Sequence, residues 1–131
     1  MAKYFLDANI ILDLIDIDRG NLELTREFVK KAIVNNDTLY TSCDIFTTVY
    51  YVASKKMSPQ DIIIELEKLL MFIDVIAIDI DVIKEAMSLM RDNDDFEDLL
   101  QYVCALRSHS NVIVTNDKNF YRGKIELHSL R

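Results

Sequence analysis

Short apolar runs alternate with longer amphipathic segments along the whole chain. In the longer segments, apolar side chains recur at the three-to-four-residue spacing of an α-helix. We expect strands at residues 3–6, 38–41, 74–78, 111–115 and 124–128. We expect helices at 10–15, from about 22 to 34, from Ser42 to Lys55-Lys56, from Ser58 onward, at 81–91 and at 96–107. Strands that alternate with helices predict a three-layer α/β/α fold around a central, mainly parallel sheet of four to five strands.

The composition is that of one compact domain spanning residues 1–131. Half of the residues are hydrophobic, and only two are Gly and one is Pro. The apolar runs are far shorter than the roughly 20 residues of a membrane span, so we expect no membrane insertion. Cys43 and Cys104 sit within apolar patterns and lack metal-ligand spacing, as expected of reduced core thiols in a cytoplasmic protein.

The formal net charge is −7. This balance argues against a protein that grips nucleic acid with its whole surface. It still allows an enzyme whose bound metal ions contact phosphates, because a divalent cation reverses the local sign of the charge. It also fits a chain that works beside a basic partner.

Acidic side chains follow the predicted strands. Asp7 comes directly after strand 3–6, Asp117 comes shortly after strand 111–115, and Asp98 opens helix 96–107 behind an acidic loop. The carboxyl ends of parallel strands form the ligand crevice of an open α/β sheet. Each acid alone also fits a helix cap or a favourable place in a helix dipole. Carboxylates gathered at one edge repel one another unless a hard divalent cation neutralises them, so together they predict an oxygen-ligand metal site.

Four segments in this order resemble the PIN domain family, and the resemblance covers essentially the whole chain. They are Phe5-Leu6-Asp7-Ala8-Asn9-Ile10-Ile11-Leu12-Asp13, Thr41-Ser42 with Thr47-Thr48-Val49-Tyr50-Tyr51-Val52, Asp95-Phe96-Glu97-Asp98-Leu99-Leu100-Gln101, and Val114-Thr115-Asn116-Asp117-Lys118-Asn119-Phe120. The family is one of metal-dependent ribonucleases and includes the VapC toxins of bacterial toxin–antitoxin pairs. The resemblance implies an endoribonuclease with RNA as substrate, a small antitoxin protein as a possible partner, and a homodimer.

The resemblance also implies roles for individual residues. Asp7, Asp98 and Asp117 match the acids that hold Mg²⁺ or Mn²⁺, and Asn9 matches the polar residue beside the first of them. Thr115 matches the hydroxyl residue that supports the last acid. The expected chemistry is hydrolysis of an RNA phosphodiester bond by a water molecule that the bound cation activates.

One position departs from the family pattern. Thr48 stands where the family has its second acid, and a hydroxyl is a poorer ligand than a carboxylate for a hard divalent cation. Asp44 lies one helical turn earlier and is one candidate for the missing charge, although it also suits the helix dipole. Glu97 is a second candidate, sharing or replacing the role of Asp98. The alternative is a catalytically weakened PIN-like domain that serves as an RNA- or protein-binding module.

Two further groups of charged residues complete the set of expectations. The candidate phosphate contacts are Lys55, Lys56, Lys118 and Arg122, although a lysine at a helix C-terminus also offsets the dipole. We expect Asp13, Asp16 and Asp18 to form a solvated face, because carboxylates are rarely buried.

Overall fold

A computed structural model describes residues 1–131, except for the side chain of Ile17. The elements in chain order are β1 (Lys3–Leu6), α1 (Ala8–Ile15), the 3₁₀ helix η1 (Ile17–Arg19), α2 (Leu22–Val34), β2 (Thr38–Ser42), α3 (Ile45–Ala53), α4 (Pro59–Leu69), β3 (Ile73–Ile76), α5 (Ile80–Leu89), α6 (Phe96–Arg107), β4 (Val112–Val114) and β5 (Glu126–His128). Among the described residues, no helix has the length and apolar character needed to cross a membrane.

All five strands are parallel and lie in the order β3-β2-β1-β4-β5. The chain builds outward from β1 through β2 to β3, and then returns to place β4 on the other side of β1. In the register, Phe5 of β1 lies between Tyr40 of β2 and Ile113 of β4. The strand order therefore reverses between β1 and β4, and in open α/β sheets ligands bind outside the carboxyl ends of the strands at such a point.

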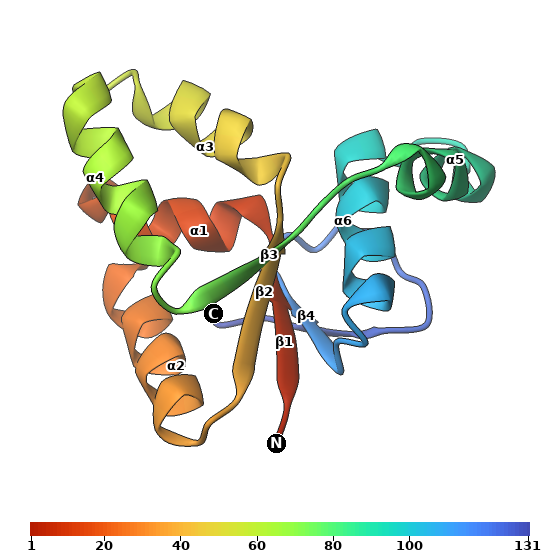
Figure 1. Cartoon of the computed structure of the whole chain (residues 1–131), viewed down its shortest axis with the longest axis horizontal. Coiled ribbons are helices and arrows are strands. Elements are labelled where there is room, and N and C mark those ends of the chain that lie inside the picture. The colour runs from red at the N-terminus through yellow and green to blue at the C-terminus, as the bar shows by residue number, and fades with distance from the viewer.

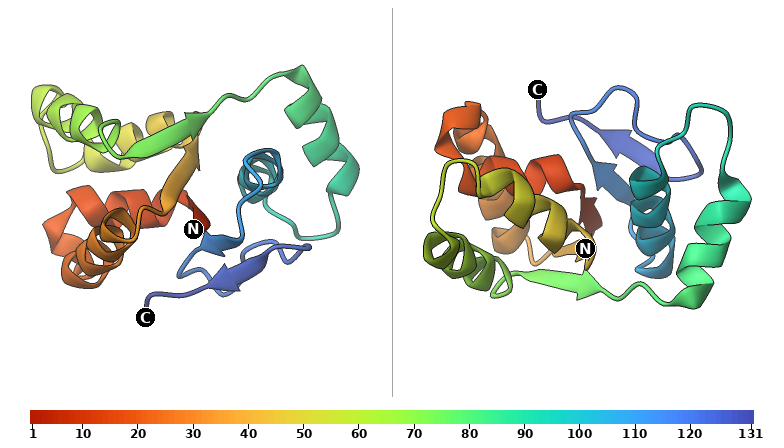
Figure 2. Two further views of the ribbon diagram at one scale, coloured as in Figure 1. Left: turned by 60° about the horizontal axis from the view of Figure 1, so that its bottom comes forward. Right: turned by 90° about the horizontal axis from the view of Figure 1, so that it is seen from above.

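Helices cover both faces of the sheet (Figure 1). Helices α1 to α4 lie on one face, and α5 and α6 lie on the other (Figures 1 and 2). Neighbouring side chains of β1 supply the two cores, because residues along a strand alternate between faces. Leu6 packs into the core beneath α1 to α4, and Phe5 packs into the core beneath α5 and α6. The predicted three-layer α/β/α fold with a parallel sheet is confirmed.

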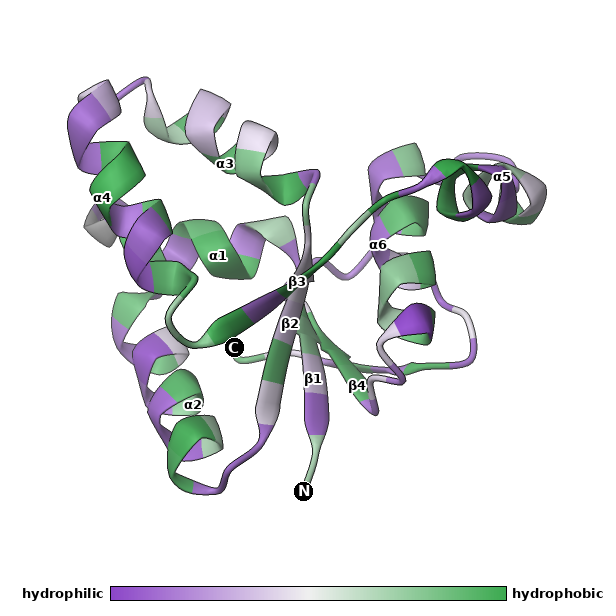
Figure 3. Ribbon diagram, viewed as in Figure 1, coloured by the Kyte–Doolittle hydropathy of each residue, from purple (hydrophilic) through white to green (hydrophobic). Residues whose placement is uncertain are grey.

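The helices α2 and α4 are amphipathic, with polar and apolar stretches visible along each ribbon (Figure 3). Val29 and Ala32 of α2 and Ile62 and Leu66 of α4 are buried in the core. The start of α4 is as predicted: Ser58 is the N-cap, its hydroxyl accepts a hydrogen bond from the Asp61 amide at 3.2 Å, and Pro59 is the first helical residue.

Several boundaries differ from those expected. The strands are shorter than predicted: β3 is Ile73–Ile76, β4 is Val112–Val114 and β5 is Glu126–His128. Helix α5 spans Ile80–Leu89, and α3 ends at Ala53 rather than at Lys55-Lys56. The prediction that Ser42 caps α3 is wrong. The N-cap position belongs to Asp44, and the Ser42 hydroxyl donates to the Asp44 carboxylate instead.

Two predictions about burial are also wrong. Cys43 is exposed, so only Cys104 is a core thiol. Asp13 is 1% exposed rather than solvated, because Arg19 folds back from η1 and its Nε lies 2.7 Å from Asp13 Oδ1. A paired carboxylate can be buried where an isolated one cannot.

Candidate active site

Asp7 occupies the step from β1 into α1. It is 3% exposed, and both of its carboxylate oxygens have partners. Oδ1 accepts a hydrogen bond from the Ile10 amide at 2.9 Å, which makes Asp7 the N-cap of α1. Oδ2 accepts a hydrogen bond from the Thr115 hydroxyl at 2.5 Å. These two hydrogen bonds fix the orientation of a buried carboxylate at the end of β1, behind the acidic cavity that Asp98 and Asp117 line.

Thr115 connects the ends of β1 and β4. Its hydroxyl donates to Asp7 and accepts a hydrogen bond from the Asp117 amide at 3.1 Å. Asp117 in turn accepts from the Asn119 amide at 2.8 Å, so a side-chain turn holds the segment after β4. One buried hydroxyl thus ties two of the three predicted acids to the same edge of the sheet.

The third acid comes from the first turn of α6. Asp95 is the N-cap of this helix, and its carboxylate accepts a hydrogen bond from the Asp98 amide at 3.2 Å. A cavity of about 370 Å³ lies beside this turn. Its lining consists of polar side chains: Asn9, Asn93, Asp95, Glu97, Asp98, Asp117 and Asn119.

The carboxyl groups of the site influence one another electrostatically. Burial raises the pKa of Asp7 to about 6, and the nearby Asp117 and Asp13 add to this rise against the lowering effect of the hydrogen bonds from Thr115 and Ile10. Burial also raises the pKa of Asp98 to about 7, and Asp95, Asp117, Asp7 and Glu97 push it in the same direction. Asp7, Asp98 and Asp117 are therefore close enough to repel one another.

These residues suit a hard divalent cation. Carboxylate and amide oxygens are the ligands that Mg²⁺ and Mn²⁺ prefer, and a cation would offset both the burial and the neighbouring acids that raise the pKa of Asp98. Among the described side chains, no three acids, histidines or cysteines lie close enough together to hold a metal ion as they stand. A cation here would therefore draw the carboxylates closer or complete its coordination with water, as Mg²⁺ commonly does.

The sequence and the architecture agree with a known family. The family model of the PIN domain matches residues 4–125. The chain belongs to the PIN domain family.

This PIN domain is similar to a VapC ribonuclease in sequence and to two solved VapC structures in fold. Ribonuclease VapC1 from Aquifex aeolicus (strain VF5) is 33% identical over 128 residues, which cover 95% of this chain and 88% of the relative. The crystal structure of VapBC2 from Rickettsia felis, bound to a DNA fragment from their promoter, has a TM-score of 0.69 at 18% identity and covers 97% of this chain and 98% of its own. The sarcin-ricin loop cleaving toxin VapC20 from Mycobacterium tuberculosis has a TM-score of 0.72 at 13% identity, covering 89% and 92%. The two structural likenesses show the shared fold.

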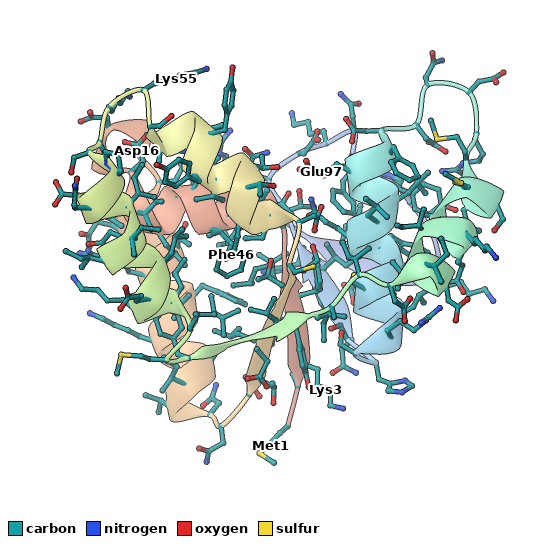
Figure 4. All side chains as sticks on the ribbon, turned by 45° about the horizontal axis from the view of Figure 1, so that its top comes forward. Met1, Lys3, Asp16, Phe46, Lys55 and Glu97 are labelled. Carbon is teal, nitrogen blue, oxygen red and sulfur yellow. The ribbon has the colours of Figure 1, made fainter. Side chains whose placement is uncertain are left out.

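In this PIN domain, a hydroxyl on α3 forms a hydrogen bond with an acidic side chain on α6. The Thr48 hydroxyl donates a hydrogen bond to Glu97 Oε2 at 3.0 Å, and the Gln101 amide nitrogen donates to Glu97 Oε1 at 3.3 Å. Figure 4 shows Glu97 between these two helices. Gln101 is 1% exposed, so the Glu97 carboxylate is held from a rigid part of the core.

Asp44 has a different environment. Its carboxylate accepts from Ser42, and its Oδ2 is buried without a hydrogen-bond donor among the described residues. Burial raises the pKa of Asp44. Asp44 lies outside the residues that line the acidic cavity, whereas Glu97 is one of them.

The predicted phosphate contacts of this PIN domain fall into two groups. Lys118 and Arg122 line a second cavity, of about 480 Å³, that shares Asp117 with the acidic one. Lys55 and Lys56 lie beyond the other end of α3. Lys56 pairs with Asp16 and Asp18 at 3.8 and 3.9 Å, and Lys55 lies over the Tyr51 ring. Figure 4 shows Lys55 near Asp16 and far from Glu97.

The second cavity also contains residues that were not predicted from the sequence. They are Asn116, Ser129 and Arg131. Asn116 lies inside the fourth family segment, between the predicted residues Thr115 and Asp117. Ser129 and Arg131 reach the cavity only because β5 pairs in parallel with β4, and nothing in their local sequence marks that position.

Proposed function

We propose that this PIN domain is a metal-dependent endoribonuclease and the toxin of a toxin–antitoxin pair. The observation that carries the proposal is the position of Asp7, Asp98 and Asp117. They follow β1, open α6 and follow β4 at the reversal of the strand order, near enough for Asp7 and Asp117 to add to the raised pKa of Asp98. A bound cation would stabilise the ionised form of these carboxylates. The 33% identity to Ribonuclease VapC1 supports RNA as the substrate.

Asp7, Asp98 and Asp117 would hold Mg²⁺ or Mn²⁺. Once bound, the cation would polarise a phosphate of the substrate and lower the pKa of the attacking water. The chain itself supplies position. Thr115 and the start of α1 fix the two oxygens of Asp7, and the Asp95 cap fixes the turn that carries Asp98. Preset ligands spare the reaction the cost of organising them.

Asn9 completes the first motif as a supporting residue. It lines the acidic cavity, and its Oδ1 accepts a hydrogen bond from Arg19 at 3.3 Å. That contact leaves the Asn9 amide N–H groups as donors for a substrate phosphate oxygen or a metal-bound water. Asn9 therefore orients the substrate, while the acids hold the cation.

We assign the place of the missing family acid to Glu97. Thr48, at that position in α3, donates a hydrogen bond to Glu97 and so brings a carboxylate to the region where α3 supplies none. Glu97 also lines the same cavity as Asp98 and Asp117. Thr48 and Gln101 act as positioning residues in this assignment, and Asp44 supports the start of α3 through Ser42.

Protein partners belong to the same proposal. The Rickettsia felis VapBC2 complex is an assembly of this fold with a second protein, and a small antitoxin is the partner we propose here. Apolar side chains are exposed on and just after α4, including Ile63, Ile64, Leu70 and Met71. Exposed apolar groups of this kind suit burial in a homodimer or by an antitoxin. We expect the protein to act in the cytoplasm, where RNA is available.

The direct test is cleavage of an unstructured RNA in the presence of Mn²⁺. The wild-type protein should cut it, and addition of EDTA should stop cleavage. Asp7→Asn should lose activity by at least about a hundredfold, because it removes charge from the metal site while an amide oxygen can still cap α1. Arg26→Gln, an exposed substitution on α2, is the control for contaminating nuclease and should behave as wild type. Equal cleavage by wild type and Asp7→Asn would reject the proposed function.

A further inference from the structure

The cavity next to the acidic one gathers positive charge in an acidic protein. Lys118, Arg122 and Arg131 line it, although the chain has only 15 Lys and Arg against 22 Asp and Glu. Among the described side chains, none of these three cations lies within 4.0 Å of a carboxylate. The clustering of Lys118, Arg122 and Arg131 is therefore not explained by ion pairs with acidic side chains of this chain.

Asn116 holds the C-terminal segment at the same cavity. Its Oδ1 accepts hydrogen bonds from the Leu130 amide at 2.9 Å and from the Ser129 hydroxyl at 3.1 Å, which fixes the side-chain amide. Asn116 therefore anchors the C-terminal segment that carries Arg131 to the wall of this cavity.

The loop that carries Arg122 is anchored in the core. The Lys124 amide donates a hydrogen bond to the Tyr102 hydroxyl at 2.8 Å. Gly123 packs so closely on this ring that a Cβ would lie 2.3 Å from Tyr102 Cζ. Tyr102 itself is buried, so it cannot easily move aside. Arg122 is therefore presented from a fixed backbone, in a cavity that it shares with Leu127 of β5 and with Arg131.

We propose that this cavity binds the phosphate backbone of the RNA strand, one nucleotide or so away from the phosphate held at the acids. This proposal rests on the proposed function. Three cations without a carboxylate partner favour an anion with several acceptor oxygens, and a phosphodiester offers them. The cavity shares Asp117 with the acidic site, so it lies next to the place where the scissile phosphate would be held. Its volume of about 480 Å³ suits a unit of nucleotide size.

Fluorescence anisotropy of a short labelled oligouridine tests this site separately from cleavage. The titrations are run in EDTA, which removes the metal site from the measurement. Lys118→Gln/Arg122→Gln should weaken binding about tenfold. For this variant, a plot of the logarithm of the binding constant against the logarithm of the salt concentration should have a shallower slope. The slope should change by about 0.7 for each phosphate that the variant no longer neutralises. Arg131→Gln alone should give a smaller change in the same direction.

The matched control is Arg26→Gln/Lys30→Gln. It removes the same number of charges from α2, where the two residues line a different cavity together with Leu14 and Leu69. This control should bind the RNA as wild type does. Equal weakening in the two double variants would overturn the proposal, because it would report net charge alone. The proposal would also be overturned if a polyglutamate peptide bound with the same affinity as the oligouridine. That result would assign the cavity to an acidic protein segment.

The two proposals fail in different ways. Asp7→Asn tests the nuclease through cleavage and should keep near-wild-type RNA affinity in EDTA. If Lys118→Gln/Arg122→Gln binds RNA normally while Asp7→Asn is inactive, the nuclease assignment stands and the phosphate cavity is rejected.

Discussion

The hydroxyl of Thr48 donates a hydrogen bond to Glu97 across 49 residues of sequence, with 3.0 Å between Oγ1 and Oε2. Thr48 occupies the α3 position where the family pattern has an acid, and Glu97 lies one residue before Asp98 on α6. In the assignment proposed above, the Thr48 hydroxyl orients the Glu97 carboxylate toward the metal site instead of supplying a carboxylate itself.

An exchange of these two residues tests that role. Glu97→Gln should weaken Mn²⁺ binding at least about tenfold, as expected when a hard cation loses a charged oxygen. The double variant Thr48→Glu/Glu97→Thr moves the acid to α3 and the hydroxyl to α6, and should recover most of the lost affinity. Isothermal titration with Mn²⁺ measures both.

Two single variants separate positioning from packing. Thr48→Val keeps the side-chain volume and removes the hydrogen bond to Glu97. It should lower the Mn²⁺ affinity modestly and leave the Tm of the metal-free protein nearly unchanged. Asp44→Asn should bind Mn²⁺ as wild type does. Loss of binding in Asp44→Asn, together with normal binding in Glu97→Gln, would reassign the missing acid to Asp44.

The stability of the metal-free protein should fall as the pH rises. The pKa of Asp7 is raised to about 6 and that of Asp98 to about 7, both chiefly by burial and further by neighbouring acids. The folded state therefore keeps protons that the unfolded chain has already lost between about pH 4 and pH 7. The resulting stabilisation is complete below pH 4 and is lost as the pH passes 6 and then 7. Urea denaturation in EDTA at a series of pH values measures it.

Asp98→Asn is the control for this effect, because it removes one of the two groups. The fall in stability with pH should be shallower in Asp98→Asn than in wild type. Excess Mn²⁺ should reverse the trend in wild type, since the cation binds only ionised carboxylates and its stabilisation grows with pH. Identical pH profiles for the two proteins in EDTA would contradict a raised pKa of Asp98 in the folded protein.

The buried ion pair between Arg19 and Asp13 should matter for stability. Removing one partner of such a pair leaves an uncompensated buried charge. Arg19 is 27% exposed, so we expect Arg19→Gln to cost about 2–3 kcal/mol, at or below the usual cost of breaking a buried pair. Asp13→Asn/Arg19→Gln should recover part of this stability. Thermal denaturation measures both, and an unchanged stability of Arg19→Gln would show that water already solvates Asp13.

Local pattern was sufficient to predict the fold. The alternation of strand and helix predicted the parallel sheet, and the Ser58-Pro59 step predicted the start of α4. The burial of Asp13 could not be predicted from its neighbours, because it depends on Arg19 folding back from η1. Cap positions such as that of Asp44 depend on backbone angles that several nearby residues could satisfy.

The candidate site also has residues that could be predicted from the sequence and residues that could not. Asp7 and Asp117 follow predicted strands, and the pairing of β1 with β4 brings the ends of these strands together. Asp98 opens the predicted helix α6, and the packing of that helix, not the strand order, sets its position. The hydrogen bond from Thr48 to Glu97 joins two helices that are distant in sequence, so no local sequence pattern indicates it. Arg131 joins the second cavity through the parallel pairing of β5 with β4, which the short strand Glu126–His128 signals only weakly.

Thermal denaturation with and without Mn²⁺ tests most directly whether Asp7, Asp98 and Asp117 share a cation. A ligand that binds only the folded state at a hundred times its Kd stabilises it by about 2.7 kcal/mol, which raises the Tm of a domain of this size by several degrees. The wild-type Tm should rise in this way at pH 8, and Asp7→Asn, Asp98→Asn and Asp117→Asn should each lose most of the shift. A full Mn²⁺ shift in all three variants, or none in wild type, would contradict the shared site and favour a binding module without a metal centre.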